Sequence, residues 1–245
     1  MINHPNIPLQ PLNHKPKIAI AIIILAGGEG KRFGGVNKAL LPFGKHNLAQ
    51  HMLAKSRSLF AHVQPFFTIE NQSVALNSNQ NIADFSSLNI DIIKDHFSDY
   101  RGPLSGVFAG LQWAINHSHK VDYIFTLPCD TPLLPDDLLL QMLLHLHHIS
   151  TSPSPQLPYR KSIFLRHKDR NHPVIGLWHV DNRDKLADFL EGEYYKVQRF
   201  IDECEHDWCD YDGFQKDYDP FLNVNHKEDL MRAEQLFLNH NQSLI

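Results

Sequence analysis

The stretch that most constrains this chain is an apolar run, Ile18–Leu25, which ends abruptly at a glycine-rich loop. An isoleucine-rich run of this length is typical of a strand buried in a parallel sheet. Five glycines follow within nine residues, with three cations among or just after them: Gly27, Gly28, Gly30, Gly34, Gly35, Lys31, Arg32 and Lys38. Because glycine lets backbone N–H groups approach a ligand closely, a buried strand followed by such a loop predicts a phosphate-binding site.

The same stretch has an alternative interpretation as a secretory signal. Lys15-Pro-Lys17 resembles a basic n-region, and Ile18–Ala26 resembles an apolar region with a small-residue cleavage site. We favour the buried strand, because the glycine loop has no role in a cleavage site. The run is also too short to span a bilayer, and no other stretch is a better candidate.

Length and composition are those of a globular protein. With 245 residues, 42% apolar and 20% charged, the chain can form one large α/β domain. We expect a disordered leader over residues 1–16 and a single domain over residues 17–245. The formal net charge of −4 gives no basic field for duplex nucleic acid, and three cysteines make no disulfide framework, which indicates a reducing, cytoplasmic compartment.

Hydrophobic periodicity divides the chain into alternating strands and helices. Strands are expected at 18–25, 64–69, 90–93, 122–127, 161–166, 173–178 and 221–225. Helices are expected at 47–60, 102–117, 135–148, within 181–203 and at 227–237. Residues 71–89 are polar and should contain a short helix, while 202–219, with eight acids against one lysine, should be solvated. Asn225 and Glu228 have the spacing of a capping box for the last helix.

This alternation predicts a mostly parallel sheet covered by helices on both faces. Polar clusters follow several of the expected strands: the glycine loop, Asp95, Asp130, and the pair Asn223 and Asn225. Because open α/β sheets bind ligands at the carboxyl ends of their strands, we expect these clusters to converge on one site.

Two common phosphate-binding patterns do not fit the loop. The dinucleotide fingerprint begins at Gly28-Glu-Gly30 but has Phe33 where its third glycine should be. A Walker A loop would need glycine at Leu25 and Ser or Thr at Arg32. The pattern that remains over residues 25–38 is Leu-Ala-Gly-Gly-x-Gly-x-Arg-Phe-Gly-Gly-x-x-Lys.

That pattern resembles the signature loop of Rossmann-like nucleotidyltransferases and, in its Leu-Ala-Gly-Gly form, that of the molybdenum cofactor guanylyltransferase (MobA-like) family. Four further segments resemble later motifs of the family in the same order: Asp95–Gly106, Pro128–Pro132 with Leu134-Pro135, His172–Leu177 and Phe221–Asn225. The resemblance covers residues 18 to about 236. It implies a Rossmann-like three-layer α/β/α fold with a mostly parallel central sheet.

The resemblance also implies a reaction, the Mg²⁺-assisted transfer of GMP from GTP to the terminal phosphate of molybdenum-bound molybdopterin, with release of pyrophosphate. Both reactants are anions, so positioning and charge neutralisation would supply most of the catalysis. Arg32, Lys38 and Asp130 are the expected catalytic residues, and Asp130 is the expected Mg²⁺ ligand. The expected nucleotide and cofactor contacts are Leu25, Ala26, Gly27, Gly28, Lys38, Asn71, Asp95, Gly102, Asp130, Asn223 and Asn225.

Several of these side chains also have an ordinary structural interpretation. Lys38 alone would be a solvated surface lysine, Asp130 a cap for the turn that follows it, and Asp95 a turn residue. We favour function because each of them falls within its motif, and both aspartates follow an expected strand. Asn71 is the candidate for a nucleotide-contacting asparagine that the family carries after its second strand.

Two features bear on the substrates. Gly27 favours GTP, since the cytidylyl relatives tend to carry alanine there. The family's Arg-Arg pair is absent from residues 192–200, where Lys196 and Arg199 are the candidates to replace it. The alternatives are a cytidylyl or sugar-phosphate nucleotidyltransferase and a non-catalytic molybdopterin carrier. We further expect a monomer that meets molybdopterin-loading proteins and molybdoenzyme chaperones.

Two cysteine motifs have structural interpretations. Cys204-x-His206-x-x-Cys209 lacks a fourth ligand for tetrahedral zinc. Cys129 has no nearby base in the sequence, so we expect a small buried residue rather than a nucleophile.

Overall fold

A computed structural model of the protein describes residues 15–28, 33–80, 82–97, 102–116, 121–151, 161–192, 194–212 and 217–242. Arg32 and most of the expected leader lie outside the described residues. Of the leader, Lys15 and Pro16 are described, and the Pro16 carbonyl accepts a hydrogen bond from the Thr68 amide at 2.9 Å.

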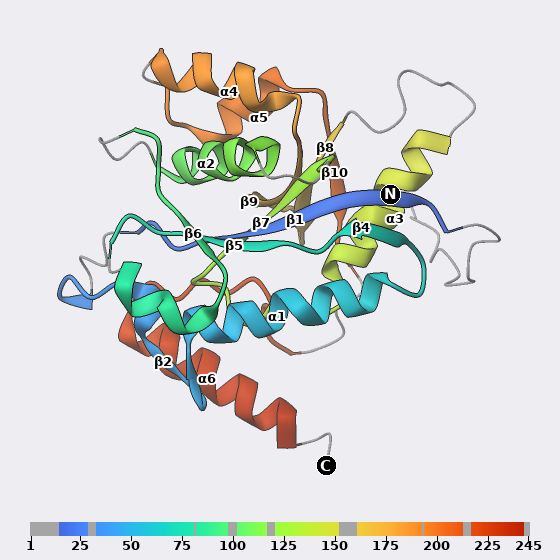
Figure 1. Ribbon diagram of the computed structural model, residues 1–245. Helices are drawn as coiled ribbons and strands as arrows, with labels where there is room; N and C mark the ends of the chain where they lie inside the picture. The colour runs from blue at the N-terminus through green and yellow to red at the C-terminus, as the bar shows by residue number, and fades with distance from the viewer. Residues whose placement is uncertain are drawn as a thin grey trace.

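An eight-stranded sheet forms the centre of the molecule, in the order β10-β8-β9-β7-β1-β5-β6, with β4 paired to the start of β1 (Figure 1). Strand β9 is antiparallel to both of its neighbours, and the other pairings in this sheet are parallel. The expectation of a mostly parallel sheet is thus confirmed. The strands are β1 Lys17–Leu25, β4 Thr68–Asn71, β5 Val74–Asn77, β6 Asp91–Ile93, β7 Tyr123–Pro128, β8 Ser162–His167, β9 Arg170–His179 and β10 His206–Asp210.

Helices cover both faces of the sheet, which confirms the three-layer architecture (Figure 1). One layer consists of α2 Pro103–Asn116, α4 Asn182–Glu191 and α5 Val197–Glu203, and the other is built on α1 Leu48–Val63 and α3 Leu138–Thr151. The short helices η2 Lys38–Leu40 and η3 Ile82–Leu88, the hairpin β2 Pro42–Phe43 with β3 His46–Asn47, and α6 Lys227–Gln242 complete the described part of the fold.

Strand β1 shows why its sequence produces these layers. Its side chains alternate between the two faces, so that Ile22 and Ile24 pack toward α1 and α3 while Ile23 packs toward α2. Residues 18–24 are each at most 4% exposed. An apolar run without polar alternation is what a strand covered on both faces requires.

Helix α1 begins where its sequence supplies a cap. The Asn47 side chain accepts from the Gln50 amide at 2.9 Å, and the Gln50 side chain accepts from the Asn47 amide at 3.0 Å. This capping box satisfies two main-chain donors that would otherwise lack partners. Phe237 of α6 then packs against Phe43 and His51, which attaches the last helix beside the β2–β3 hairpin.

The register of the central strands sets the position of the site. Leu25 lies opposite Asn77 on one side and opposite Pro128 on the other, and Asn77 lies opposite Ile93. The residues that follow these four positions therefore leave the sheet side by side, at its carboxyl edge.

The sequence missed two strands and predicted one that is absent. Residues 71–89 contain the expected short helix, η3, but also strand β5, and the acidic stretch contains strand β10. Residues 221–225 form no strand and are attached by a hydrogen bond from the Val224 amide to the Asp130 carbonyl at 2.7 Å. Among the described residues, no helix is both long and apolar enough to cross a membrane.

Candidate active site

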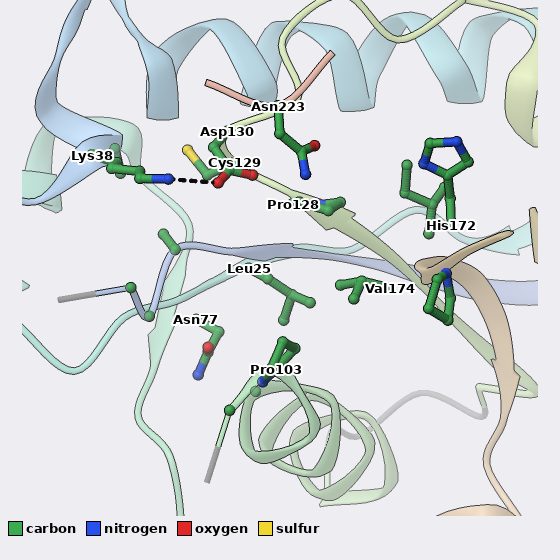
Figure 2. Close-up of a pocket in the computed structure, with 18 of the residues that line it drawn as sticks. Leu25, Lys38, Asn77, Pro103, Pro128, Cys129, Asp130, His172, Val174 and Asn223 are labelled. Carbon is green, nitrogen blue, oxygen red and sulfur yellow. Dashed lines mark hydrogen bonds and ion pairs between the residues drawn. The ribbon is translucent and has the colours of Figure 1, made fainter. Parts of the chain in front are cut away.

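A pocket of about 390 Å³ opens at the carboxyl edge of β1, β5 and β7 (Figure 2). A volume in this range is typical of small-molecule sites. Its lining includes most of the residues that the sequence motifs predicted: Leu25, Ala26, Gly27, Gly28, Lys38, Asp95, Gly102, Asp130 and Asn223. Thus the polar clusters do converge, as the strand order requires.

Main-chain hydrogen bonds hold the loops of this edge together. The Ala26 amide donates to the Asn77 carbonyl, and the Cys129 amide donates to the Leu25 carbonyl, both at 2.9 Å. The Ser78 amide donates to the Ile93 carbonyl, also at 2.9 Å. These bonds extend the strand pairing by about one residue and fix where the site loops begin.

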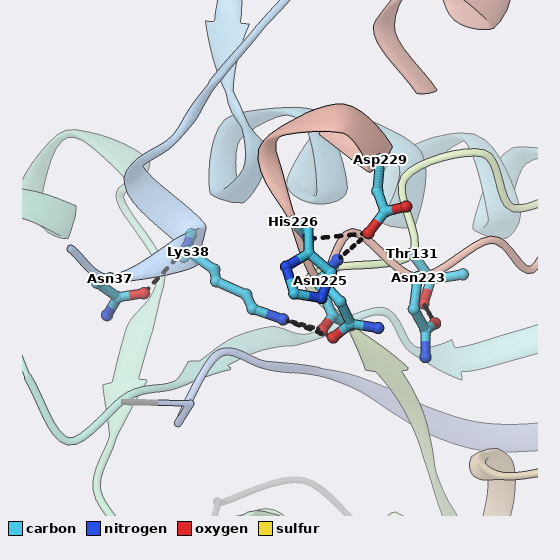
Figure 3. Close-up of polar contacts among 9 residues, drawn as sticks. Asn37, Lys38, Thr131, Asn223, Asn225, His226 and Asp229 are labelled. Atoms are coloured by element: carbon cyan, nitrogen blue, oxygen red, sulfur yellow. Dashed lines mark hydrogen bonds and ion pairs between the residues drawn. The ribbon is translucent and has the colours of Figure 1, made fainter. Parts of the chain in front are cut away.

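Lys38 and Asp130 meet at the centre of the site. Lys38 Nζ lies 2.9 Å from Asp130 Oδ2 (Figure 2) and 3.1 Å from Asn225 Oδ1 (Figure 3). The side chains of Lys38 and Asp130 are only 19% and 25% exposed, so water screens this ion pair less than a pair on the open surface. The arrangement places one cation and one anion where ligand phosphates and a metal could meet.

Asn37 aims Lys38 into the pocket. It is buried, and its Oδ1 accepts from the Ala39 amide at 2.9 Å at the start of η2. Its Nδ2 donates to Ser78 Oγ at 3.3 Å, which joins η2 to the loop after β5. Sequence reasoning missed Asn37, although it directly precedes Lys38 in the signature loop.

The segment that carries Asn223 and Asn225 reaches the site from the carboxyl-terminal part of the chain. Thr131 Oγ1 donates to Asn223 Oδ1 at 2.7 Å (Figure 3). Helix α6 is capped by Asp229, whose carboxylate accepts from the amides of Asn225 and His226 at 3.0 and 2.8 Å. The expected capping box of Asn225 with Glu228 was therefore wrong by one residue, since His226 and Asp229 occupy those positions. The Asn225 side chain is left to accept from Lys38.

Asn77 is a site residue that the sequence did not identify. It lines the pocket, and its Nδ2 donates to Asp95 Oδ1 at 2.9 Å. Two glycines make room for this side chain: a Cβ on Gly106 would lie 2.5 Å from Asn77 Oδ1, and one on Gly27 would lie 3.3 Å away. Gly27 thus has a physical role, since it leaves space for an amide beside the loop.

Asn71 does not belong to this site, so the prediction that placed it there was wrong. It ends β4 and lies opposite Ala19, six residues before Leu25 along β1 and so roughly 20 Å from the carboxyl edge. Its Oδ1 accepts from the Ser73 amide and hydroxyl at 2.8 and 2.6 Å. It supports a turn that leads into β5, and the asparagine from this part of the chain that lines the pocket is Asn77.

The wall facing the glycine loop is formed by β9. Phe164 pairs with Gly176 while Leu165 pairs with His172, so residues 173–175 bulge out of the ladder and line the pocket. Thr126 Oγ1 donates to the Val174 carbonyl at 2.6 Å, which fixes the bulge from β7.

An imidazole and a guanidinium side chain lie on the same wall. His172 and Arg170 both line the pocket. Burial, together with the positive charge of Arg170, lowers the pKa of His172 to about 4. His172 is therefore a neutral hydrogen-bonding group near pH 7 rather than a cation.

The cysteines of the described residues are buried thiols. Burial raises the pKa of Cys129, which lines the pocket beside Asp130. Burial also raises the pKa of Cys204 to about 11 and that of Cys209 to about 12. Across the described ranges, no group of three or more His, Cys, Asp or Glu side chains is arranged to hold a metal ion.

Fold and site together define a class. A three-layer α/β/α sheet with a glycine loop, a lysine and a strand-end aspartate at its carboxyl edge is the arrangement of a Rossmann-like nucleotidyltransferase. The profile of the MobA-like NTP transferase domain matches residues 22–207. The chain belongs to this family and is a nucleotidyltransferase.

Relatives of known name agree with this assignment. The molybdenum cofactor guanylyltransferase of Cereibacter sphaeroides is 34% identical, over 87% of this chain and 95% of its own. That of Rhodopseudomonas palustris strain HaA2 is 33% identical, over 87% of this chain and 90% of its own. The molybdopterin-guanine dinucleotide biosynthesis protein A of Archaeoglobus fulgidus shares the fold, with a TM-score of 0.62 at 19% identity over 91% of this chain and 100% of its own.

Proposed function

We propose that this protein transfers GMP from GTP to the terminal phosphate of molybdenum-bound molybdopterin, forming molybdopterin guanine dinucleotide and pyrophosphate. The observation that carries the proposal is the contact of Lys38 with Asp130 and Asn225, in a pocket bordered by the glycine loop. The names of the relatives support the choice of both substrates.

In this reaction an oxygen of the acceptor's terminal phosphate forms a bond to the α-phosphorus of GTP. The bond from that phosphorus to the oxygen bridging to the β-phosphate breaks, and pyrophosphate leaves with the electron pair. Negative charge grows on the leaving group, so a cation held beside it lowers the barrier. Lys38 is the proposed cation, with Arg32 as a second candidate in the same loop.

The nucleotide would bind along the glycine loop. Residues 25–28 and Gly102, together with Asn77 and Asp95, line that half of the pocket. Asn77 takes the role that the sequence had suggested for Asn71. The opposite wall, with Arg170, neutral His172 and the bulge 173–175, leaves room for the pterin of the second substrate.

Mg²⁺ suits the oxygen groups around Asp130. The ion prefers one or two carboxylates supplemented by phosphate oxygens and water, and here one carboxylate lies beside the amide side chains of Asn223 and Asn225. Asp130 would hold the ion, which when bound would neutralise triphosphate charge.

Pyrophosphate release measured with GTP, CTP and UTP, each with and without molybdenum-loaded molybdopterin, tests the proposal. We expect release that needs both GTP and the pterin and that is nearly abolished by Asp130→Asn. Faster release with CTP would overturn the choice of GTP. No release above background with any nucleotide would favour a carrier.

A further inference from the structure

Asn79, on the loop after β5, makes two hydrogen bonds to Asp95. Its Nδ2 donates to Asp95 Oδ2 at 2.7 Å, and its Oδ1 accepts from the Asp95 amide at 2.8 Å. One side chain thus bonds both the carboxylate and the main chain of the same residue. Such a pair of bonds restricts rotation of the Asp95 side chain about its Cα–Cβ bond.

The other carboxylate oxygen of Asp95 is held from the opposite direction. Asn77 Nδ2 donates to Asp95 Oδ1 at 2.9 Å. The two asparagines come from the end of β5 and the loop after it, and Asp95 comes from the loop after β6. Each asparagine uses one Nδ2 donor for one carboxylate oxygen, so the plane of the carboxylate is fixed.

The position of Asn79 separates its role from that of Asn77. Asn79 is exposed and does not line the pocket, whereas Asp95 does. Bonds made in contact with water add little to the stability of a fold. Fixing a carboxylate before a ligand arrives, however, lowers the entropy that the ligand would otherwise have to remove on binding.

We propose that Asn79 is a positioning residue for the nucleotide, acting through Asp95. It holds the Asp95 carboxylate in the orientation in which it meets the nucleotide. This inference rests on the proposed nucleotide function of the pocket. It adds a residue outside the pocket on which nucleotide affinity depends.

A double-mutant cycle tests the inference through the Kd for GTP, measured by calorimetry, and through KM and kcat. Asn79→Ala should raise Kd and KM for GTP about fivefold, the order expected for one or two hydrogen bonds, and change kcat less than twofold. In an Asp95→Ala background, Asn79→Ala should have no further effect. Gln80→Ala, an exposed neighbour that does not line the pocket, is the matched control.

A second substitution makes the test sharper. Asn79→Asp places a carboxylate opposite Asp95 and should weaken GTP binding more than Asn79→Ala, because like charges repel. When Asp95 is replaced by Asn, Asn79→Asp should weaken GTP binding no more than Asn79→Ala does. The thermal unfolding midpoint of each variant controls for folding.

The outcomes separate the two proposals. Equal effects of Asn79→Ala with and without Asp95, or unchanged GTP affinity in Asn79→Ala, would overturn the positioning role while leaving the transferase function intact. A wild-type protein that neither binds GTP nor releases pyrophosphate would overturn the proposed function itself.

Discussion

Lys38 is the side chain on which the charge arrangement of the site depends most. Its Nζ contacts Asp130 and Asn225, and Asn37 fixes the start of the short helix that carries it. Asp130 is the only carboxylate that Lys38 meets in the described interactions. A bound triphosphate would offer Lys38 a more highly charged partner and would leave Asp130 available to a metal.

Replacement of Lys38 should therefore reduce turnover strongly. We expect Lys38→Ala to cost on the order of 2–4 kcal/mol of transition-state stabilisation, the range for loss of one preorganised donor, seen as a fall in kcat. Steady-state pyrophosphate release measures it, with Lys55→Ala as a control because Lys55 pairs with Asp136 elsewhere on the molecule. A change confined to KM would mean that Lys38 only binds substrate.

The same substitution should change metal binding in the opposite direction. Without nucleotide, Lys38 neutralises the carboxylate that we assign to the metal, so Lys38→Ala should bind Mn²⁺ several-fold more tightly than the wild type. Electron paramagnetic resonance of free Mn²⁺ gives the affinity directly. Equal affinities in the two proteins would contradict this competition.

Gly106 has a packing role that can be tested by adding one methyl group. A Cβ there would lie 2.5 Å from Asn77 Oδ1 and 2.9 Å from Leu25 Cδ2. Gly106→Ala should therefore lower the free energy of unfolding by about 1–3 kcal/mol, as overpacking does. Chemical denaturation measures the loss.

Gly28→Ala is the matched control for this measurement, because no atom of the described residues lies within 4 Å of the added Cβ. Its free energy of unfolding should stay within about 0.5 kcal/mol of the wild type. Equal losses in the two variants would argue against steric contact with Asn77 as the cause.

The start of helix α1 allows a separate test of local stability. Asn47→Ala removes the side-chain oxygen that accepts from the Gln50 amide and should cost about 1 kcal/mol, while Asn47→Asp should retain most of the cap. Thermal unfolding of both variants measures the difference. An alanine variant as stable as the aspartate variant would show that the cap contributes nothing.

The strands that the sequence did not reveal are short or polar at their ends. Strand β5 has three apolar residues, Val74–Leu76, between Ser73 and Asn77, which is too few to establish a period. Because strand β5 was not predicted, Asn71 appeared to follow the second strand. The nucleotide-contacting asparagine was therefore assigned to Asn71 instead of Asn77. Strand β10 was not predicted because it contains acidic residues. An edge strand tolerates them because one of its sides faces solvent.

Residues 221–225 were predicted to form a strand but do not. Apolar Phe221 and Val224 are buried, so the apolar character that suggested a strand is real. No strand pairs with this segment among the described residues, and its main chain instead contacts the loop that carries Asp130. A sequence pattern reports which side chains are buried, but the pairing partner is set by the tertiary fold.

The long buried elements and the site motifs were predictable for a different reason. Strand β1 and the glycine loop combine a strong pattern with resemblance to a family, and the strand order then brings Asp95 and Asp130 beside the loop. Contacts between side chains on separate loops, such as Asn79 with Asp95, depend on the register of β5 and β6. No sequence period encodes that register.

The molecule as a whole should lose stability in mild acid. Burial lowers the pKa of His51 to about 4, from about 6.5 in an unfolded chain, and His172 behaves similarly. Between those values the unfolded chain binds protons that the folded protein excludes. The free energy of unfolding therefore falls as the pH drops from about 6.5 toward 4, by up to about 1.4 kcal/mol per pH unit for each group.

Urea unfolding at several pH values between 7 and 4 measures this slope. His51→Gln should make the slope shallower, whereas His62→Gln, an exposed substitution on the same helix, should leave it as in the wild type. A slope unaffected by His51→Gln would refute the assignment to that residue.

The main-chain bonds at the carboxyl edge have a consequence for how such a protein can diverge. The amides of Ala26, Ser78, Cys129 and Val224 hold the site loops through groups that every residue except proline possesses. Side chains on these loops can therefore be exchanged by mutation without dismantling the scaffold. The same scaffold can thus be inherited by enzymes with unrelated acceptors, and it offers a starting point for engineering new ones by loop replacement.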